Sequence, residues 1–254
     1  MTASNDTTEA RRVVAITGAG GVLGAAIAMR LAREAGTDLV LSDVSADALH
    51  TTAGPLGETA ARTATMLADV SDAAQVDAVV QTAVERFGHL DVLVSNAGVL
   101  SPNGRIHNLA TEDWERAFRV NVLGAVHGIR AAVAVMRPRQ SGSIVLTASV
   151  AGLTAWSHSA PYCATKAAVI QLAKVAAVEY ARDGIRVNCV CPGTFRSAIH
   201  AGLPVDALDA IASRHPLGLG SPADLVGAYS YLAGEDSRWT TGAALVIDGG
   251  YSAP

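Results

Sequence analysis

Tyr162 and Lys166 are the residues of this sequence whose types and spacing most directly suggest catalysis. They lie four residues apart in the segment 161–184, which we predict to be a helix because a proline begins it and Gly184 follows its end. Side chains four apart share a helix face, and an ammonium beside a phenol favours the phenolate. Such a tyrosine can take a proton from an alcohol, or return one to a ketone, while hydride moves to or from a nicotinamide. A surface Tyr–Lys pair is common, but Ser149, thirteen residues before Tyr162, can donate to the same substrate oxygen.

The segment TGAGGVLG (17–24) is a candidate phosphate-binding loop. It follows the short apolar run 12–17, and a helix beginning after it would direct backbone N–H groups and its positive dipole end at a pyrophosphate. The common fingerprint GxGxxG fails, because Leu23 fills the third glycine position. A glycine-rich turn that serves only strand–helix packing is the alternative interpretation.

Asp43 is the candidate that selects the cofactor. It ends the second predicted strand, 19 residues beyond Gly24. An acidic side chain there accepts the ribose hydroxyls of NAD and repels the 2′-phosphate of NADP. No Arg or Lys lies in 18–24 or 41–49 to pair with that phosphate. Asp43 could instead cap the next helix, although Ser45 and Asp47 are equally available. We therefore predict NAD(H) as the cofactor.

These candidates need a scaffold that brings strand ends together. Short apolar runs alternate with helical segments, and the runs are apolar on both faces, which is typical of a buried parallel sheet with helices on both sides. We therefore predict an α/β, Rossmann-type doubly wound sheet of about seven strands in a single domain, 12–254, after a flexible tail, 1–11. The predicted strands are 12–17, 38–43, 63–70, 90–98, 142–149, 185–193 and 244–250. The predicted helices are 24–36, 46–53, 71–88, 111–136 and 161–184. Ligands of such sheets bind at the carboxyl ends of the strands.

Composition excludes several other classes of protein. Of the 254 residues, 50% are hydrophobic, and the net charge of −4 without a Lys/Arg cluster disfavours nucleic acid or an anionic membrane as partner. The polar start does not resemble a secretory signal, and no run approaches the roughly 18 apolar residues of a membrane span. Cys189 and Cys191 have no second pair of ligands beside them, so we predict no metal site, and we expect a cytoplasmic protein with reduced thiols.

Taken together, these motifs resemble the classical subgroup of the short-chain dehydrogenase/reductase family. The resemblance runs from about residue 12 to 251 and depends on the order and spacing of several short motifs. They are Thr17-Gly18…Gly24, Asp69, Asn96-Ala97-Gly98, Asn121, Ser149, Tyr162-x-x-x-Lys166, Pro192-Gly193 and Asp248-Gly249-Gly250.

The resemblance implies a role for each catalytic position. Tyr162 would be the general acid/base, and Ser149 would hydrogen-bond the substrate oxygen. Lys166 would bind the nicotinamide ribose and lower the tyrosine pKa, and Asn121 would hold a water of a proton relay. The family also implies a homotetramer, built through the two long helices 111–136 and 161–182.

The strand ends, the segments above them and the family resemblance together imply two sets of contacts. The expected cofactor contacts are Gly18, Gly20, Gly21, Val22, Leu23, Gly24, Asp43, Asp69, Val70, Asn96, Ala97, Gly98, Tyr162, Lys166, Pro192, Gly193, Phe195 and Ser197. The expected substrate contacts are Leu100, Ala151, Leu153, Trp156 and Phe195. The second set is apolar and suits an uncharged secondary alcohol or ketone, cyclic ones included, although such residues also serve ordinary packing.

The sequence departs from the family pattern at three positions. Ser95 replaces the first asparagine of Asn-Asn-Ala-Gly, and Ser197 replaces a threonine. Val22 occupies a position that is glycine in the classical loop, so that TGAGGVLG matches the TGxxGxxG of the extended subgroup. Extended members need a further substrate domain of roughly a hundred residues, and one domain already accounts for this chain. Asn121 with Ser149, and the C-terminal Asp-Gly-Gly, also favour the classical subgroup.

Two other functions remain open from the sequence. One is a 3-oxoacyl-[acyl-carrier-protein] reductase that uses NADPH and needs cationic side chains at the mouth of the site, for which Arg137 and Arg139 are available. The other is a catalytically inactive nucleotide-binding regulator. All four residues of the catalytic set are present, which favours an enzyme acting on a small alcohol or ketone.

Overall fold

Seven parallel strands form one sheet in the order β3-β2-β1-β4-β5-β6-β7. The computed structural model describes residues 11–196 and 205–253, without the side chains of 205–208. The strands are β1 (Arg12–Thr17), β2 (Thr37–Asp43), β3 (Thr63–Leu67), β4 (Val92–Ser95), β5 (Gly142–Thr147), β6 (Ile185–Pro192) and β7 (Ala244–Ile247). The predicted parallel sheet is confirmed. Its order reverses between β1 and β4, and this switch point is where doubly wound folds bind their ligands.

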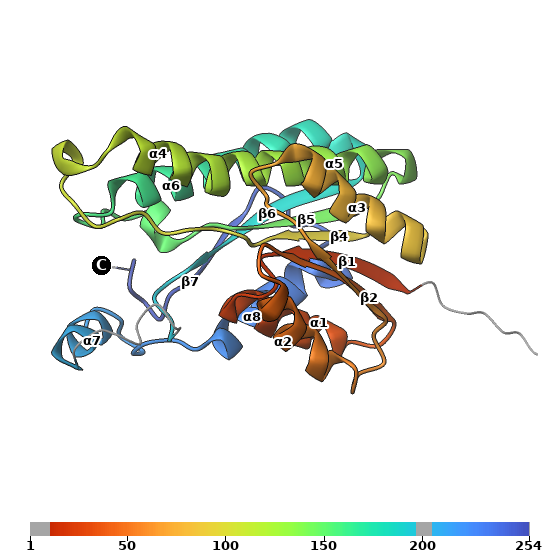
Figure 1. The fold of residues 1–254 in the computed structure, drawn as a ribbon, viewed down its shortest axis with the longest axis horizontal. Coiled ribbons are helices and arrows are strands. Elements are labelled where there is room, and N and C mark those ends of the chain that lie inside the picture. The colour runs from red at the N-terminus through yellow and green to blue at the C-terminus, as the bar shows by residue number, and fades with distance from the viewer. Residues whose placement is uncertain (1–10, 197–204, 254) are drawn as a thin grey trace, which may run out of the picture.

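Helices cover both faces of the sheet (Figure 1). One layer holds α1 (Val22–Ala32), α2 (Ala46–Leu56) and α8 (Pro222–Ala233). The other holds α3 (Ala73–Phe87), α4 (Thr111–Phe118), α5 (Gly124–Met136) and α6 (Ala160–Tyr180). A further helix, α7 (Val205–Ala212), lies beyond one end of the sheet.

Strand β1 shows why its sequence is apolar throughout. Val13 and Ala15 belong to the core beneath α3, α5 and α6, whereas Val14 and Ile16 belong to the core beneath α1 and α8. Successive side chains of a strand point to opposite faces, so a strand with helices on both sides needs apolar residues at every position.

Some element boundaries differ from the prediction. Strand β3 ends at Leu67, so Asp69 and Val70 lie in the turn after it rather than within it. The predicted helix 111–136 is continuous in space but contains a π-helical turn, Arg119–Leu123, between α4 and α5. Helix α8 was not predicted, although Pro222 begins it and Ser221 and Asp224 form a capping box at its start.

Helix α5 belongs to the core. Among the described helices, the continuous segment Thr111–Arg139 is, by length and composition alone, long and apolar enough to cross a membrane. Its side chains Ala125, Ile129, Ala132 and Met136 are buried against the sheet and α3. The apolar character of this segment is therefore explained by packing inside the protein.

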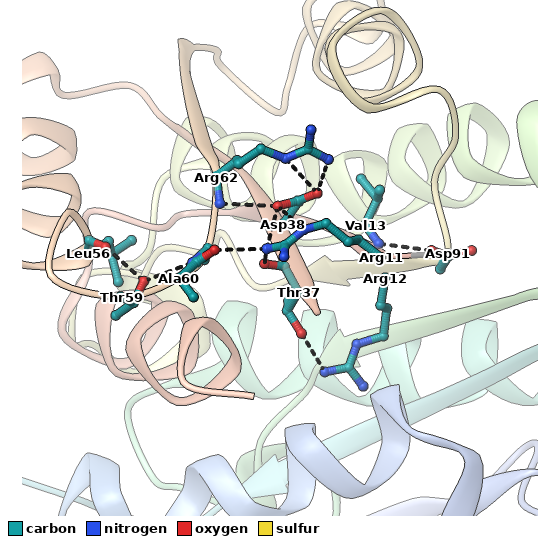
Figure 2. Close-up of polar contacts among 11 residues, drawn as sticks. Arg11, Arg12, Val13, Thr37, Asp38, Leu56, Thr59, Ala60, Arg62 and Asp91 are labelled. Carbon is teal, nitrogen blue, oxygen red and sulfur yellow. Dashed lines mark hydrogen bonds and ion pairs between the residues drawn. The ribbon is translucent and has the colours of Figure 1, made fainter. Parts of the chain in front are cut away.

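Buried charges are paired at the amino ends of the strands. Asp38, whose side chain is fully buried, accepts hydrogen bonds from the guanidinium groups of Arg11 and Arg62 and from the Arg62 backbone (Figure 2). Burial pushes the pKa of Asp38 upward, but the hydrogen bonds from Arg62 and Arg11 outweigh it and hold the pKa below its ordinary value. These contacts tie β2 to the chain entering β1 and to the start of β3.

Candidate active site

A cavity of about 940 Å³ opens at the carboxyl ends of the strands. Its size is at the upper end of the roughly 300–1,000 Å³ typical of small-molecule sites. Its walls come from the segments that follow β1, β2, β3, β4, β5 and β6, together with α6 and the C-terminal turn. The sheet thus brings most of the expected site residues to one place.

The glycine loop is shaped by close backbone approaches. Gly18 has φ +64°, and a Cβ there would lie 2.7 Å from the Cα of Ala97; a Cβ on Gly24 would lie 2.1 Å from the carbonyl oxygen of Gly18. Only glycine fits at these two positions. Helix α1 begins at Val22 without a side-chain cap, and its first turn lines the cavity. Uncapped N–H groups facing a cavity form an anion site, as the phosphate hypothesis requires.

Asp43 is part of the support of this loop. Its Oδ2 accepts from the backbone N of Gly20 at 3.0 Å, and its Oδ1 accepts from the N of Ser45 at 3.1 Å. The cap of α2 is Ser45, so the alternative role of Asp43 as that cap is not seen. Asp43 itself lines the cavity, whereas a Cβ on Gly20 would lie 2.5 Å from that of Ala48, which places Gly20 against α2.

Asn96 joins the ends of three strands. Its side-chain N donates to the carbonyl oxygen of Gly18 at 3.1 Å, and its Oδ1 accepts from Thr147 at 3.2 Å. The backbone N groups of Asn96 and Ala97 donate to Thr17 Oγ1 at 3.1 and 3.2 Å. These bonds hold the glycine loop beside β4 and β5, so the side chain of Asn96 acts within the scaffold while the residue also borders the cavity.

Ser149, Tyr162 and Lys166 all line the same cavity. The Nζ of Lys166 donates to the carbonyl oxygen of Thr147 at 2.8 Å and lies 5.7 Å from the centre of the Tyr162 ring. Ser149 precedes a 3-10 turn, Val150–Gly152, and a Cβ on Gly152 would lie 2.6 Å from the backbone of Lys166. This close approach brings the end of β5 against α6, and so brings the serine to the tyrosine.

Burial sets the electrostatics of this group. It lowers the pKa of Lys166 to about 8, because an ammonium loses its hydration in the interior. Burial also raises the pKa of Tyr162, with a side-chain hydrogen bond from Ser149 acting in the opposite direction. Desolvation is thus the largest influence on the pKa of the phenol, and the lowering of that pKa by Lys166 stays a prediction.

Asn121 lies in the π-helical turn with its side chain buried. Its Oδ1 accepts from the N of Val99 at 2.8 Å, and its Nδ2 donates to the carbonyl oxygen of Val99 at 2.9 Å and to Thr165 Oγ1 at 3.0 Å. The side chain thus fixes the segment after β4 to α6 and does not border the cavity. Its part in a proton relay remains a prediction.

The expected substrate contacts divide into two groups. Leu100, Trp156 and Phe195 line the cavity. Ala151 is buried within the 3-10 turn, and Leu153 is 48% exposed; neither contributes to the described cavity wall. Ser197, an expected cofactor contact, lies outside the described residues.

One wall of the cavity is formed by residues that were not among the expected contacts. Arg214, His215 and Tyr251 line it, and the His215 and Tyr251 rings lie 4.8 Å apart. The Nε2 of His215 accepts from the backbone N of Thr194 at 3.2 Å, which connects this wall to the segment after β6. Tyr251 directly follows the Asp-Gly-Gly motif, whose two glycines have positive φ, and this turn was the signal that could have indicated it.

Comparison with known proteins agrees with this geometry. A family model described as Enoyl-(Acyl carrier protein) reductase matches residues 18–252. The chain is 38% identical to the cis-4-hydroxycyclohexanecarboxylate dehydrogenase of Sinomonas cyclohexanicum, over 96% of this chain and 98% of that protein.

Solved structures give the same result. An NAD⁺-bound xylitol dehydrogenase superposes with a TM-score of 0.89 at 31% identity, covering 95% of this chain and 100% of that one. ElxO with NADP bound superposes with a TM-score of 0.88 at 31% identity, covering 96% and 100%. This protein therefore belongs to the short-chain dehydrogenase/reductase family of oxidoreductases.

Proposed function

We propose that this protein is an NAD-dependent dehydrogenase that interconverts a secondary alcohol and a ketone on a small, mostly apolar, cyclic substrate. The observation that carries the proposal is the meeting of Ser149, Tyr162 and Lys166 at one cavity bounded by an uncapped helix start. The 38% identical relative is named for a hydroxylated cyclohexanecarboxylate, which supports a cyclic substrate.

The residues present suit a nicotinamide dinucleotide. The start of α1 would hold the pyrophosphate, Asp43 the adenosine ribose, and Lys166 the nicotinamide ribose. The cofactor, when bound, accepts or supplies the hydride. Relatives bind NAD⁺ or NADP, so the preference for NAD rests on Asp43 and on the absence of Arg or Lys from 18–24 and 41–49.

Tyr162 performs the proton transfer in this proposal. As a phenol it donates its proton to a ketone oxygen, and the Ser149 hydroxyl holds that oxygen in place by a hydrogen bond. In the direction of oxidation, the positive charge of Lys166 stabilises the Tyr162 phenolate, which takes the alcohol proton and becomes a phenol. Cavity walls of Trp156, Leu100 and Phe195 hold the apolar body of the substrate and exclude water.

The alternative activity is reduction of the 3-oxo group of an acyl thioester bound to a carrier protein. The description of the matching family model is a reason to test it. The two arginines that could serve it are engaged elsewhere. Arg137 pairs with Asp183 at 3.2 Å and Arg139 with Asp91 at 3.1 Å, just before β5 and thus at the amino ends of the strands. This location removes the support that those two arginines gave to a carrier-protein substrate.

A two-way assay tests the proposal. Cyclic ketones and an acetoacetyl thioester are each offered with NADH and with NADPH, and oxidation of the reduced nicotinamide is followed by absorbance. We expect the cyclic ketones with NADH to give the highest kcat/KM. Preference for the thioester with NADPH would replace the proposal with the carrier-protein reductase, and binding of NADH without turnover of any substrate would favour the inactive regulator.

We also propose a homotetramer built through the helices 111–136 and 161–182. Exposed apolar side chains on this layer support it: Phe118 and Leu123 on α4 and the π turn, and Val175 and Val178 on α6, the last 82% exposed. Light scattering on the purified protein tests this state, and a monomeric mass would contradict it.

A further inference from the structure

Arg214 gives the cavity a cation at the end away from the glycine loop. It follows α7 and lines the cavity, and its guanidinium carbon lies 5.0 Å from the centre of the Tyr251 ring. A guanidinium over an aromatic ring keeps the N–H groups of its edge available, in the planar arrangement that matches a carboxylate.

An apolar wall connects this cation to the reacting centre. The Tyr251 ring meets the Trp156 ring edge-on at 6.3 Å, and the Trp156 ring lies 6.3 Å from that of Tyr162. A substrate with its reacting carbon at Tyr162 would lay its apolar body along Trp156 and Tyr251. The far end of such a substrate would then point along this wall toward Arg214, which lines the same cavity.

The acidic residues that line the cavity lie too far away to neutralise the positive charge of Arg214. Asp43 and Asp69, which line the cavity, follow β2 and β3. The wall with Arg214 is joined to β6 and β7, four strands or more from β2, which at about 4.8 Å per strand is about 19 Å. Asp248 is nearer in the chain, but its carboxylate accepts from Gly250 N, Ser252 N and Ser252 Oγ within its own turn.

We propose that the substrate is an organic acid, with a carboxylate opposite its reacting carbon, and that Arg214 binds this carboxylate. This inference rests on the proposed function and names the substrate class of the same site. It changes the expectation of an uncharged substrate drawn from the apolar side chains, because that expectation did not include Arg214. Arg116 also lines the cavity, from α4, but no described contact joins it to the aromatic wall.

The test compares a carboxylate substrate with the uncharged carboxamide of the same shape. Two ketones, 4-oxocyclohexanecarboxylate and 4-oxocyclohexanecarboxamide, are offered to the full chain and to Arg214→Leu, and kcat/KM is measured for each pair. We expect the unaltered protein to prefer the acid, and Arg214→Leu to lower the ratio of acid to amide roughly tenfold, mainly through KM. Arg214→Lys, which keeps the charge but loses the planar edge, should give an intermediate ratio. High salt should lower the ratio as well, because the guanidinium is exposed.

Two matched variants complete the test. Arg182→Leu removes an exposed guanidinium after α6, at the opposite end of the sheet, and should leave the ratio unchanged. Arg116→Leu removes the other arginine of the cavity. An unchanged ratio in Arg214→Leu, or an equal loss in Arg116→Leu, would overturn the assignment to Arg214.

A binding measurement separates this inference from the proposed function. Cyclohexanecarboxylate and cyclohexanecarboxamide carry no ketone or hydroxyl to react, so quenching of tryptophan fluorescence reports binding alone. Tighter binding of the acid that depends on Arg214 supports the carboxylate site even if neither ketone is turned over. Turnover of both ketones without preference for the acid would overturn the carboxylate site and leave the dehydrogenase proposal standing.

Discussion

Strand β2 carries an aspartate near each of its ends, and the two have different surroundings. Asp38, at the amino end, is fully buried and held by the two arginines Arg11 and Arg62 (Figure 2). Asp43, at the carboxyl end, accepts from the backbone N groups of Gly20 and Ser45, and no described ion pair includes it.

The same contrast extends across the sheet. At the amino ends, Arg139 and Asp91 form a further ion pair. At the carboxyl ends, Lys166 is buried and bonded to the neutral carbonyl of Thr147, with a lowered pKa. Removing one partner of a buried ion pair destabilises the fold, whereas a buried charge without an opposite partner costs stability and remains available to a ligand. We therefore expect substitutions at the two edges to affect different properties.

The largest expected effect is on catalysis at the carboxyl edge. Tyr162→Phe removes the proton donor and should lower turnover roughly a thousandfold. The free energy of unfolding should change by no more than about 1 kcal/mol, because the ring stays in place. NADH binding, followed by fluorescence, serves as the control and should remain nearly intact. Activity within tenfold of the unaltered protein would show that another group transfers the proton.

At the amino edge the effect should be on stability. Asp38→Ala leaves Arg11 and Arg62 without their shared carboxylate and should lower the free energy of unfolding by about 2 kcal/mol through the lost charged hydrogen bonds, measured by urea denaturation. The KM for the substrate should not change in the folded variant. Asp77→Ala, at an exposed position of α3, is the matched control with little expected effect. A raised KM in Asp38→Ala would break the division between the two edges.

Replacing Lys166 tests whether the buried charge of the active site lowers the free energy of unfolding. Its pKa is about 8 in the folded protein against an ordinary value of 10.5, so the unfolded chain binds more protons between these values. The penalty is full below about pH 8 and fades as the pH rises toward 10.5. Lys166→Met should therefore raise the free energy of unfolding near pH 7 by on the order of 2 kcal/mol, after the loss of the bond to Thr147.

The higher free energy of unfolding of Lys166→Met should disappear near pH 10.5, because the unaltered lysine is then neutral in the folded chain and is losing its proton in the unfolded chain as well. Lys174→Met, at an exposed position of the same helix, is the control and should show no such dependence on pH. A gain in Lys166→Met that is equal at both pH values would mean that packing, rather than the buried charge, is responsible.

The sheet was predictable because its signal is local. Val13 to Ile16 are apolar at every position, and this pattern alone indicates a strand covered on both faces. Tyr162 and Lys166 were predictable for the same reason, since helical spacing brings them together. Asp69 and Val70 were placed in a strand because apolar character does not mark where pairing stops: β3 pairs with β2 only as far as Leu67.

The rest depends on contacts between distant segments. Arg214 and Tyr251 meet only because the segment after α7 folds against the C-terminal turn. Gly20 was expected at the phosphates, but its position against Ala48 depends on where α2 packs. The direction of the Tyr162 pKa shift could not be obtained from its neighbour four residues away, because that direction depends mainly on burial by several elements.

Substitution of Asp43, at the carboxyl end of strand β2, should have the smallest effect, and it should act on cofactor binding. Its carboxylate both supports the glycine loop through Gly20 and, in our proposal, selects NAD over NADP. Asp43→Asn keeps an oxygen that can accept from Gly20 but removes the charge that repels a 2′-phosphate. It should therefore narrow the ratio of NAD to NADP affinity roughly tenfold, with NAD binding little weakened.

Asp43→Ala removes the charge and the support together, so it should weaken both cofactors, which titration of NADH and NADPH fluorescence measures. If the two variants behave alike, the loop does not depend on the carboxylate, and Asp43 acts on specificity alone. If neither changes the ratio, the carboxylate serves the loop only, and the aspartates at the two ends of β2 are both structural.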